Sequence, residues 1–203
     1  MSQLLEIHPE NPQARRVRVV ADCVHGGGVI VYPTDTAYAL GCHLGDKRAL
    51  ERIMAIKRLP KNHQFTLACA DLSELGTYAR VDNSGYRLLK RVTPGPFTFV
   101  LRATREVPRR LLHVKRKTIG MRVPDNAIAQ ALLEQLGEPL MTTTVRLGDN
   151  PPMTDPHEIF DAIRHQVDIV IDGGMADETV STVVDLTDPE ASVIREGAGA
   201  LSL

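Results

Sequence analysis

Hydroxyl and cationic side chains recur where the predicted strands of this chain end, and their types suit anion binding. The β-branched and aromatic run at residues 29–32 indicates an interior strand, and Pro33 cannot continue a central ladder, so the chain leaves the sheet there. Thr34, Asp35 and Thr36 therefore arrive at a strand end, where ligands tend to bind in open α/β sheets. The alternative is an Asx or Ser/Thr turn that closes on itself.

More side chains of this kind follow along the chain. Arginine can grip a carboxylate through two parallel hydrogen bonds, lysine acts as a point charge on phosphate, and hydroxyls donate to anionic oxygens without adding net charge. The pattern therefore indicates phosphate and carboxylate chemistry. The residues concerned are Lys57, Thr118, Arg122, Thr142, Thr143, Thr144, Ser181 and Arg195.

The familiar nucleotide and metal motifs are missing from the sequence. No G-x-x-x-x-G-K-[ST] is present, which excludes a P-loop, and the glycine runs at 26–28 and 173–174 indicate turns. The seven histidines do not fall at metal-ligand spacing, so we predict no protein-bound metal. Cys23, Cys42 and Cys69 suggest neither a disulfide framework nor a zinc knuckle.

Composition favours one globular domain over residues 1–203. With 203 residues and 43% hydrophobic content, the chain can bury a substantial core. No apolar run is long enough to span a bilayer, and the polar first 18 residues do not resemble a secretory signal. We therefore expect a cytoplasmic protein with no membrane partner.

A net charge of −1 conceals a strong asymmetry. Residues 1–148 hold 22 Lys/Arg against 13 Asp/Glu, whereas residues 149–203 hold 2 against 12. Residues 102–122 alone carry +7, which would attract polyanions and above all nucleic acid. Alternatively, the acidic C-terminal part folds back and neutralises this segment, or its side chains are simply solvated. The candidate RNA contacts are Arg109, Arg110, Lys115, Arg116 and Lys117.

The elements that must position these side chains alternate irregularly. Apolar periodicity and capping residues predict helices at 46–57, 83–91 and 125–136, and short helices from 71 and 155. Such a mixture indicates an α/β or α+β domain with a twisted, partly antiparallel sheet. Strands are predicted at 29–32, 65–70, 97–101, 117–123, 140–145, 167–171 and 182–186.

Seven motifs in order make the chain resemble the YrdC/YciO family, and within it the YciO branch. The resemblance covers residues 17–199, the expected core. The motifs are P-T-D-T-A-Y-A-L-G (33–41), I-K-R-L-P (56–60), T-P-G-P-F-T-F-V-L (93–101), T-I-G-M-R-V-P (118–124), L-M-T-T-T-V-R (140–146), S-T-V-V-D (181–185) and I-R-E-G (194–197).

The resemblance implies a single YrdC-like domain whose highly twisted mixed sheet encloses a basic concave cavity. It implies affinity for double-stranded RNA or tRNA. In the better-studied branch it implies threonylcarbamoyl-AMP synthesis from ATP, L-threonine and bicarbonate, which feeds the threonylcarbamoyladenosine modification of tRNA. Mg²⁺ would accompany ATP on its phosphates.

Residue roles follow from the resemblance position by position. Threonine would contact Thr34, Thr36, Thr142 and Ser181, with Arg122 holding its carboxylate. The nucleotide would contact Lys57, Thr118, Thr144 and Arg195. From the residues alone, Thr118 and Thr142 could be plain strand positions and Arg195 a surface ion pair, whereas Arg122 between two apolar neighbours is harder to explain without an anion.

The chain departs from the synthase branch in a catalytic tetrad written K-x-R and S-x-N. Here the corresponding residues are Lys57, Leu59, Thr144 and Arg146, of which Lys57, Thr144 and Arg146 are the candidate catalytic residues. One hypothesis is a YciO-type protein that binds double-stranded RNA and an adenylate, with weak, altered or hydrolytic chemistry on threonylcarbamoyl-AMP. The alternative is a working synthase in which Arg146 replaces the arginine missing at Leu59.

Overall fold

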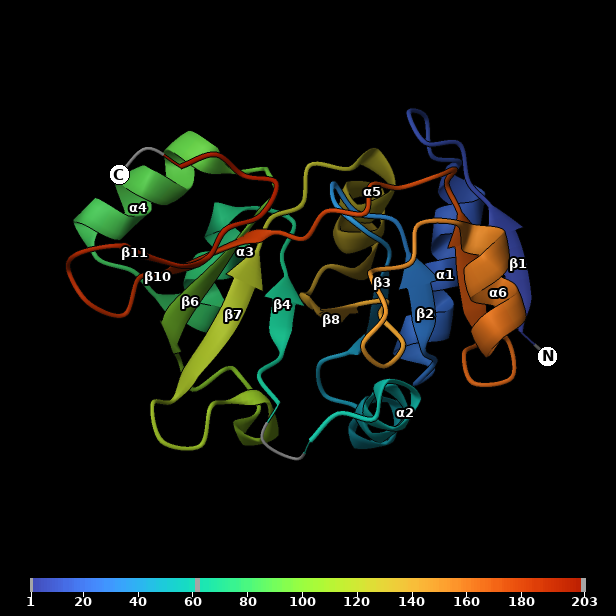
Figure 1. Cartoon of the computed structure of the whole chain (residues 1–203), viewed down its shortest axis with the longest axis horizontal. Coiled ribbons are helices and arrows are strands. Elements are labelled where there is room, and N and C mark those ends of the chain that lie inside the picture. Colours follow the sequence, from blue (N-terminus) through green and yellow to red (C-terminus); the bar gives the residue numbers. More distant parts are fainter. Residues whose placement is uncertain (1, 61–62, 202–203) are drawn as a thin grey trace.

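One mixed sheet runs through the molecule. The computed structural model describes residues 2–60 and 63–201. Its strands are β1 (Gln3–Glu6), β2 (Ile30–Tyr32), β3 (Ala39–His43), β4 (Thr66–Ala68), β5 (Ala79–Arg80), β6 (Phe97–Ala103), β7 (Thr118–Arg122), β8 (Leu140–Thr144), β9 (Ile169–Asp172), β10 (Thr182–Asp185) and β11 (Ser192–Arg195). Within the described residues they pair in the order β1-β9-β2-β3-β8-β4-β7-β6-β10-β11, and β5 pairs with the end of β6 (Figure 1).

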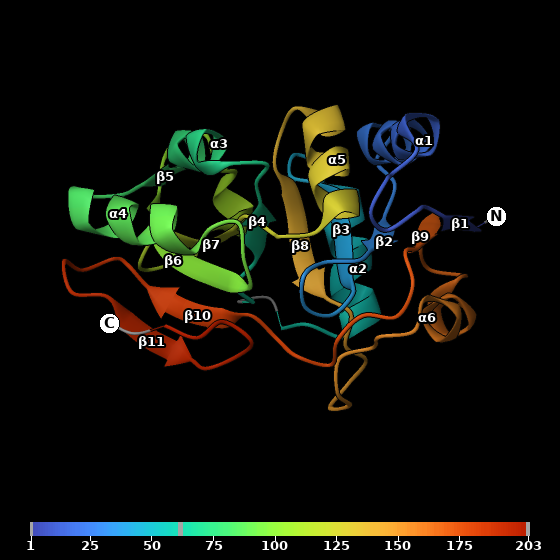
Figure 2. The same cartoon turned by 90° about the horizontal axis from the view of Figure 1, so that it is seen from above.

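Six α-helices of the described chain pack around this sheet. Helices α1, α3, α4 and α5 lie on one side, whereas α6 and the β10–β11 hairpin lie on the other, at opposite ends of the sheet (Figure 2). Their bounds are α1 (Ala14–His25), α2 (Lys47–Lys57), α3 (Leu72–Tyr78), α4 (Asn83–Val92), α5 (Ala127–Leu136) and α6 (Pro156–Ile163), with a short 3₁₀ helix at Arg109–Leu111.

Local sequence accounts for most helix ends. The carboxylates of Asp46, Asp71, Asp82 and Asp155 accept backbone N–H groups at the starts of α2, α3, α4 and α6, as N-caps do. Gly137 ends α5 in the left-handed conformation with φ 68°, where glycine carries no Cβ penalty. The helix boundaries predicted at 71, 137 and 155 are thus confirmed.

Two apolar clusters sandwich the strands of one half of the sheet. Val29 and Val31 belong to a cluster that includes residues of α2 and α6, whereas Ile30 and Tyr32 belong to one that includes residues of α1 and α5. Since strand side chains alternate between faces, β2 is buried on both sides, as its uninterrupted apolar run predicts.

In the other half, alternation separates core from cavity. Phe97, Phe99 and Leu101 of β6 pack in the core that also holds residues of α3 and α4. Thr98 and Val100, on the opposite face of the same strand, line a cavity instead. The fold therefore leaves one sheet face of β6 and its neighbours available to a ligand.

The mixed, partly antiparallel sheet predicted from the sequence is confirmed. Strand β2 is parallel to β9, β4 to β7 and β6 to β10, while the neighbours of β3, β2 and β8, are antiparallel to it. The sequence analysis did not predict the strands β1, β3, β5 and β11 or the helix α1. None of the helices in the described residues is both long and apolar enough to cross a membrane.

Candidate functional site

A cavity of about 440 Å³ opens where β6, β7, β8 and the β10–β11 hairpin face one another. This volume lies within the range of about 300–1,000 Å³ typical of small-molecule sites. None of the described residues that line it carries a carboxylate. The polar lining consists of the basic residues Lys57, His63, Arg122, Arg146 and Arg195, Gln64, and the hydroxyls of Thr66, Thr98, Thr142, Thr143, Thr144 and Ser181. Such a lining suits an anionic ligand.

Arg122, the last residue of β7, is the buried cation of this cavity. Its side chain is 7% exposed and donates from Nη2 to the carboxylate of Asp35, which is 8% exposed. Nη2 also lies 3.5 Å from Oγ1 of Thr36. Its Nε is buried and, in the described chain, has no hydrogen-bond partner. Because buried polar groups are nearly always paired, this donor calls for an acceptor that a ligand could supply.

The turn after β2 closes on itself and also reaches Arg122. Thr34 Oγ1 donates to the carbonyl of Ala37 at 2.7 Å and lies 3.0 Å from Thr36 Oγ1. Asp35 accepts from the backbone N–H of Asp125 at 3.0 Å. The Ser/Thr turn that the sequence left open is therefore present. Thr34, Asp35 and Thr36 lie behind Arg122 and are not among the described cavity-lining residues.

Lys57 ends α2 with its ammonium group in the cavity wall. Nζ donates to Thr143 Oγ1 at 2.8 Å and to the carbonyl of Thr144 at 2.6 Å. Burial, with a smaller contribution from the charge of Arg146, lowers the pKa of Lys57 to about 8. Thr144, which the sequence reasoning named as a tetrad residue, lines the same cavity, and Lys57 contacts its carbonyl, whereas the hydroxyl in contact with Lys57 belongs to Thr143.

The two departures from the synthase tetrad lie on the same cavity. Leu59 lines it and packs its side chain against the core. Arg146 lines it from the loop after β8, where Nε donates to the carbonyl of Asn150 at 2.6 Å. Leu59 therefore replaces the arginine of the synthase tetrad, and Arg146 places a guanidinium elsewhere in the same lining.

Arg195 reaches the cavity from the edge strand β11. Its Nη2 donates to the carbonyl of Ser181 at 2.8 Å and lies 3.3 Å from Ser181 Oγ. Burial and the charges of Arg122 and Arg146 lower the pKa of Arg195. Among the described residues Arg195 forms no carboxylate ion pair, so the surface ion pair considered above is not seen.

Two further hydroxyl pairs involve the lining residues Thr98, Ser181 and Thr142. Ser181 Oγ lies 2.8 Å from Thr98 Oγ1, and Thr142 Oγ1 lies 2.7 Å from the hydroxyl of the buried Tyr32. Sequence reasoning did not include Thr98 or Tyr32. The available signal was the hydroxyl of Thr98 in an otherwise apolar strand, which alternation places opposite Phe97 and Phe99.

Thr118 is the predicted nucleotide contact that the structure does not bring to the cavity. It is buried on β7, on the same strand face as Gly120 and Arg122, but it is not among the described lining residues. No three His, Cys, Asp or Glu side chains within residues 2–60 and 63–201 are placed to hold a metal ion.

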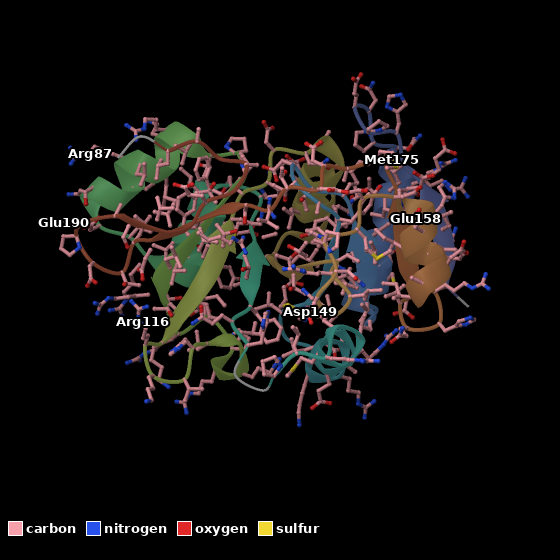
Figure 3. The ribbon with its side chains drawn as sticks, viewed as in Figure 1. Arg87, Arg116, Asp149, Glu158, Met175 and Glu190 are labelled. Carbon is pink, nitrogen blue, oxygen red and sulfur yellow. The ribbon has the colours of Figure 1, made fainter. Side chains whose placement is uncertain are left out.

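The basic segment is exposed and in part neutralised from within the chain. Arg116 pairs with Asp185 at 3.0 Å and donates to Thr187 at 3.1 Å, while Arg110 donates to the carbonyls of Leu44 and Gly45. In Figure 3, Arg116 lies beside the β6–β7 connection, far from Glu158 on α6. Arg109, Lys115 and Lys117 are exposed on the same connection. The acidic C-terminal part therefore neutralises part of the segment, as one alternative anticipated.

Comparison with known proteins decides the family. A model of the Sua5/YciO/YrdC family, described as telomere recombination, matches residues 22–197. The chain belongs to the Sua5/YciO/YrdC family. This assignment confirms the resemblance found in the sequence, and the matched residues contain every cavity-lining residue named above.

Similar proteins include one named YciO and others named threonylcarbamoyl-AMP synthase. The protein named YciO of Escherichia coli (strain K12) is 56% identical over 200 residues, 98% of this chain and 97% of that protein. Its crystal structure superposes with a TM-score of 0.95, covering 98% of both chains. A protein named threonylcarbamoyl-AMP synthase from Nitrosococcus oceani is 33% identical over 159 residues, 78% of this chain and 85% of the synthase.

One similar solved structure is a complex with an amino acid. Pyrococcus abyssi Sua5 complexed with L-threonine superposes with a TM-score of 0.89 at 27% identity, covering 97% of this chain and 58% of the archaeal one. The mixed fold described above is therefore shared with the matched part of that Sua5 chain.

Proposed function

We propose that the cavity binds L-threonine together with an adenine nucleotide, or the threonylcarbamoyl adenylate that unites them. The donor set carries this proposal: Lys57, Arg122, Arg146 and Arg195 line one cavity without a carboxylate among its described residues. A ligand of this class presents a carboxylate and a phosphate, which are the anions that arginine forks and lysine bind best. The synthase relative and the L-threonine complex of Sua5 support the same class of ligand.

The chemistry that we propose on this ligand is weak, altered or hydrolytic rather than efficient synthesis. Leu59 presents an apolar side chain where the synthase tetrad carries an arginine, and Arg146 is tied through Nε to its own loop. Charge stabilisation aimed at the developing charge is usually the largest catalytic contribution, so a displaced guanidinium should slow phosphoryl chemistry. The alternative is a working synthase in which Arg146 supplies the missing charge.

Mg²⁺ enters this proposal only with ATP. The described lining offers no carboxylate to bind the ion. Mg²⁺ commonly takes one or two carboxylates plus substrate phosphates and water, so here the phosphates and water would have to provide its ligands. We therefore expect the ion to accompany ATP rather than to bind the protein alone.

Pyrophosphate release from ATP, with bicarbonate and with or without L-threonine, tests the proposed chemistry. We expect little threonine-dependent release from the native chain and a rise of about tenfold or more in the double variant Leu59→Arg with Arg146→Asn, because the guanidinium returns to its tetrad position. Lys57→Ala serves as the blank. Vigorous release from the native chain that is lost in the blank would establish the alternative, and no gain in a folded double variant would contradict the role given to Leu59.

We also propose that the β6–β7 connection contacts double-stranded RNA. Arg109, Lys115 and Lys117 are exposed on it, and none of the ion pairs described within residues 2–60 and 63–201 involves them. The chain has only four Phe, four Tyr and no Trp, which favours recognition of a duplex backbone over stacking on single-stranded bases.

A further inference from the structure

Asp35 does not line the cavity, yet it contacts the one cation that is buried there. We propose that Asp35 is a positioning residue: it engages one nitrogen of Arg122 and leaves the other donors of that guanidinium to grip the ligand's carboxylate. The inference rests on the function proposed above and deepens it, because it names the residue that orients the amino-acid end of the ligand.

Both oxygens of Asp35 are used within the protein. Oδ1 accepts from Nη2 of Arg122, and Oδ2 accepts from the backbone N–H of Asp125 at 3.0 Å. A carboxylate held at both oxygens cannot rotate without losing one of these bonds. The turn after β2 and the β7–α5 connection are joined a second time by Asn126, whose Nδ2 lies 3.4 Å from the carbonyl of Thr34. Asp35 is thus fixed with respect to the strand that carries Arg122.

The contact with Asp35 uses only part of the hydrogen-bond donors of Arg122. Guanidinium has five N–H donors in a rigid planar fork, so fixing one nitrogen sets the direction of the others. Nη2 is committed to Asp35, whereas Nε is buried without a partner in the described chain. Since Arg122 lines the cavity, the N–H groups that Asp35 does not take are the ones that a ligand's acceptor would meet.

The contact with Asp35 also leaves Arg122 with directed hydrogen-bond donors but little net charge to offer a ligand. Asp35 and Arg122 are both almost fully buried and carry opposite charges, so together they add little net charge to the cavity. The positive charge for an anion then comes mainly from Lys57, Arg146 and Arg195. Arg122 instead contributes directed donors, which fix the orientation of a carboxylate rather than its attraction from a distance.

Replacing the carboxylate by an amide separates these two roles. In Asp35→Asn the side chain keeps its size, but one of its two terminal oxygens becomes an NH2 donor, so it no longer offers an acceptor at both of the positions that Arg122 and the N–H of Asp125 occupy. Arg122 then regains its full charge but loses its fixed direction. A positioning role predicts weaker carboxylate binding, whereas a role in charge alone predicts tighter binding.

Calorimetric titration with L-threonine and with L-threoninol, which has an alcohol in place of the carboxylate, tests the inference. We expect Asp35→Asn to bind L-threonine at least tenfold more weakly and L-threoninol as the native chain does. Asp35→Glu should recover part of the loss, because the carboxylate is restored. Asn126→Ser is the matched control, since it removes the amide that bridges the same two loops, keeps a side-chain oxygen that can cap α5, and does not touch Arg122.

The outcomes separate this inference from the function on which it rests. Absence of L-threonine binding by the folded native chain would overturn the proposed function. Native binding that Asp35→Asn leaves equal or makes tighter would overturn the positioning role alone, as would equal losses for L-threonine and L-threoninol or the same loss in Asn126→Ser. If Asp35→Asn does not fold, the ratio of the two affinities in Asp35→Glu decides, and an unchanged ratio would contradict the role.

Discussion

The environment of the Lys57 ammonium group, which is partly buried and close to another cation, disfavours its protonated form. The side chain is partly buried at the end of α2, and Arg146 lines the same cavity, so both desolvation and like charge lower its pKa to about 8. Two oxygen acceptors, Thr143 Oγ1 and the carbonyl of Thr144, hold the ammonium group in the wall. A phosphate bound nearby would meet a cation at neutral pH and a neutral amine at higher pH.

This pKa predicts how nucleotide affinity depends on pH. Lys57 is protonated below about pH 8 and loses its proton as the pH rises through that value. His63 also lines the cavity among the described residues. Because its pKa is lowered, its imidazole is neutral throughout the pH range in which Lys57 loses its proton. A charged hydrogen bond contributes about 1.5–3 kcal/mol, so AMP affinity should fall about tenfold or more between pH 7 and pH 9.5.

Fluorescence or calorimetric titration of AMP across this pH range measures the effect. Lys57→Gln should bind more weakly at pH 7 and show a nearly flat profile, because the titrating group is gone. A native profile without a step near pH 8, or an unchanged step in Lys57→Gln, would show that Lys57 does not contact the phosphate.

At the scale of elements, local sequence rules predicted a buried strand and several helix ends, but they could not assign Thr98 to the cavity. The apolar run at 29–32 and the helix caps at Asp71, Gly137 and Asp155 follow from local rules, and the structure has them. Residues 97–101 of β6 are apolar except for Thr98, although the second face of this part of the strand lines the cavity through Thr98 and Val100. The hydrophobic pattern alone therefore could not assign Thr98 to a site.

Two of the missed strands depend on distant partners, whereas the missed helix α1 carries a local signal, because its buried residues Val17, Val20, Ala21 and Val24 follow helical spacing. Strand β11 is exposed at all four residues and exists through its pairing with β10, and β1 is an edge strand placed by β9. Arg122 was predicted from its apolar neighbours, but its partner Asp35 lies 87 residues away in sequence, on another strand end. Such long-range pairings leave no periodic signal in a single sequence.

Strands β4 and β7 approach so closely at Gly120 that adding a methyl group there should destabilise the fold. A Cβ at Gly120 would come within 2.6 Å of Thr66 Oγ1 and 3.2 Å of the carbonyl of Phe65, both at the cavity wall. Overpacking of this kind typically costs about 1–3 kcal/mol, so Gly120→Ala should lower the free energy of unfolding by that amount. For a domain of this size the expected fall in Tm is about 2–12 °C.

Gly76 on α3 is the matched control for this substitution. A Cβ there would meet no described atom within 4 Å, and alanine is the better helix former. Thermal unfolding should therefore show Gly76→Ala equal to or slightly above the native Tm. Equal Tm values for Gly120→Ala and the native chain would contradict the close packing between β4 and β7.

At the scale of the whole molecule, the fold brings together basic and acidic segments that lie far apart in the sequence. The basic β6–β7 connection lies toward one end of the sheet, and its Arg116 is paired with Asp185 of the acidic C-terminal part (Figure 3). Net charge near zero therefore does not describe the surface that an RNA would meet. Arg109, Lys115 and Lys117 remain exposed there.

Salt dependence tests whether this surface binds double-stranded RNA. Each phosphate contact releases counterions, so the logarithm of affinity should fall linearly with the logarithm of salt concentration. The double variant Lys115→Ala with Lys117→Ala should weaken binding for all duplex sequences and reduce the slope by about 1–2, measured by electrophoretic shift or anisotropy. Arg15→Ala on α1, at the opposite end of the sheet, is the control. A salt-independent interaction, or equal loss in the control, would exclude the proposed surface.

The central claim is that the cavity binds L-threonine through Arg122 beside an adenine nucleotide, and calorimetric titration of the AMP-saturated protein with L-threonine tests it most directly. The account predicts saturable binding by the native chain, a loss of at least tenfold in Arg122→Gln, and native affinity in Arg164→Gln at the end of α6, with AMP binding as the check on folding. No heat of L-threonine binding to the folded native chain, or equal affinity in Arg122→Gln, would contradict it.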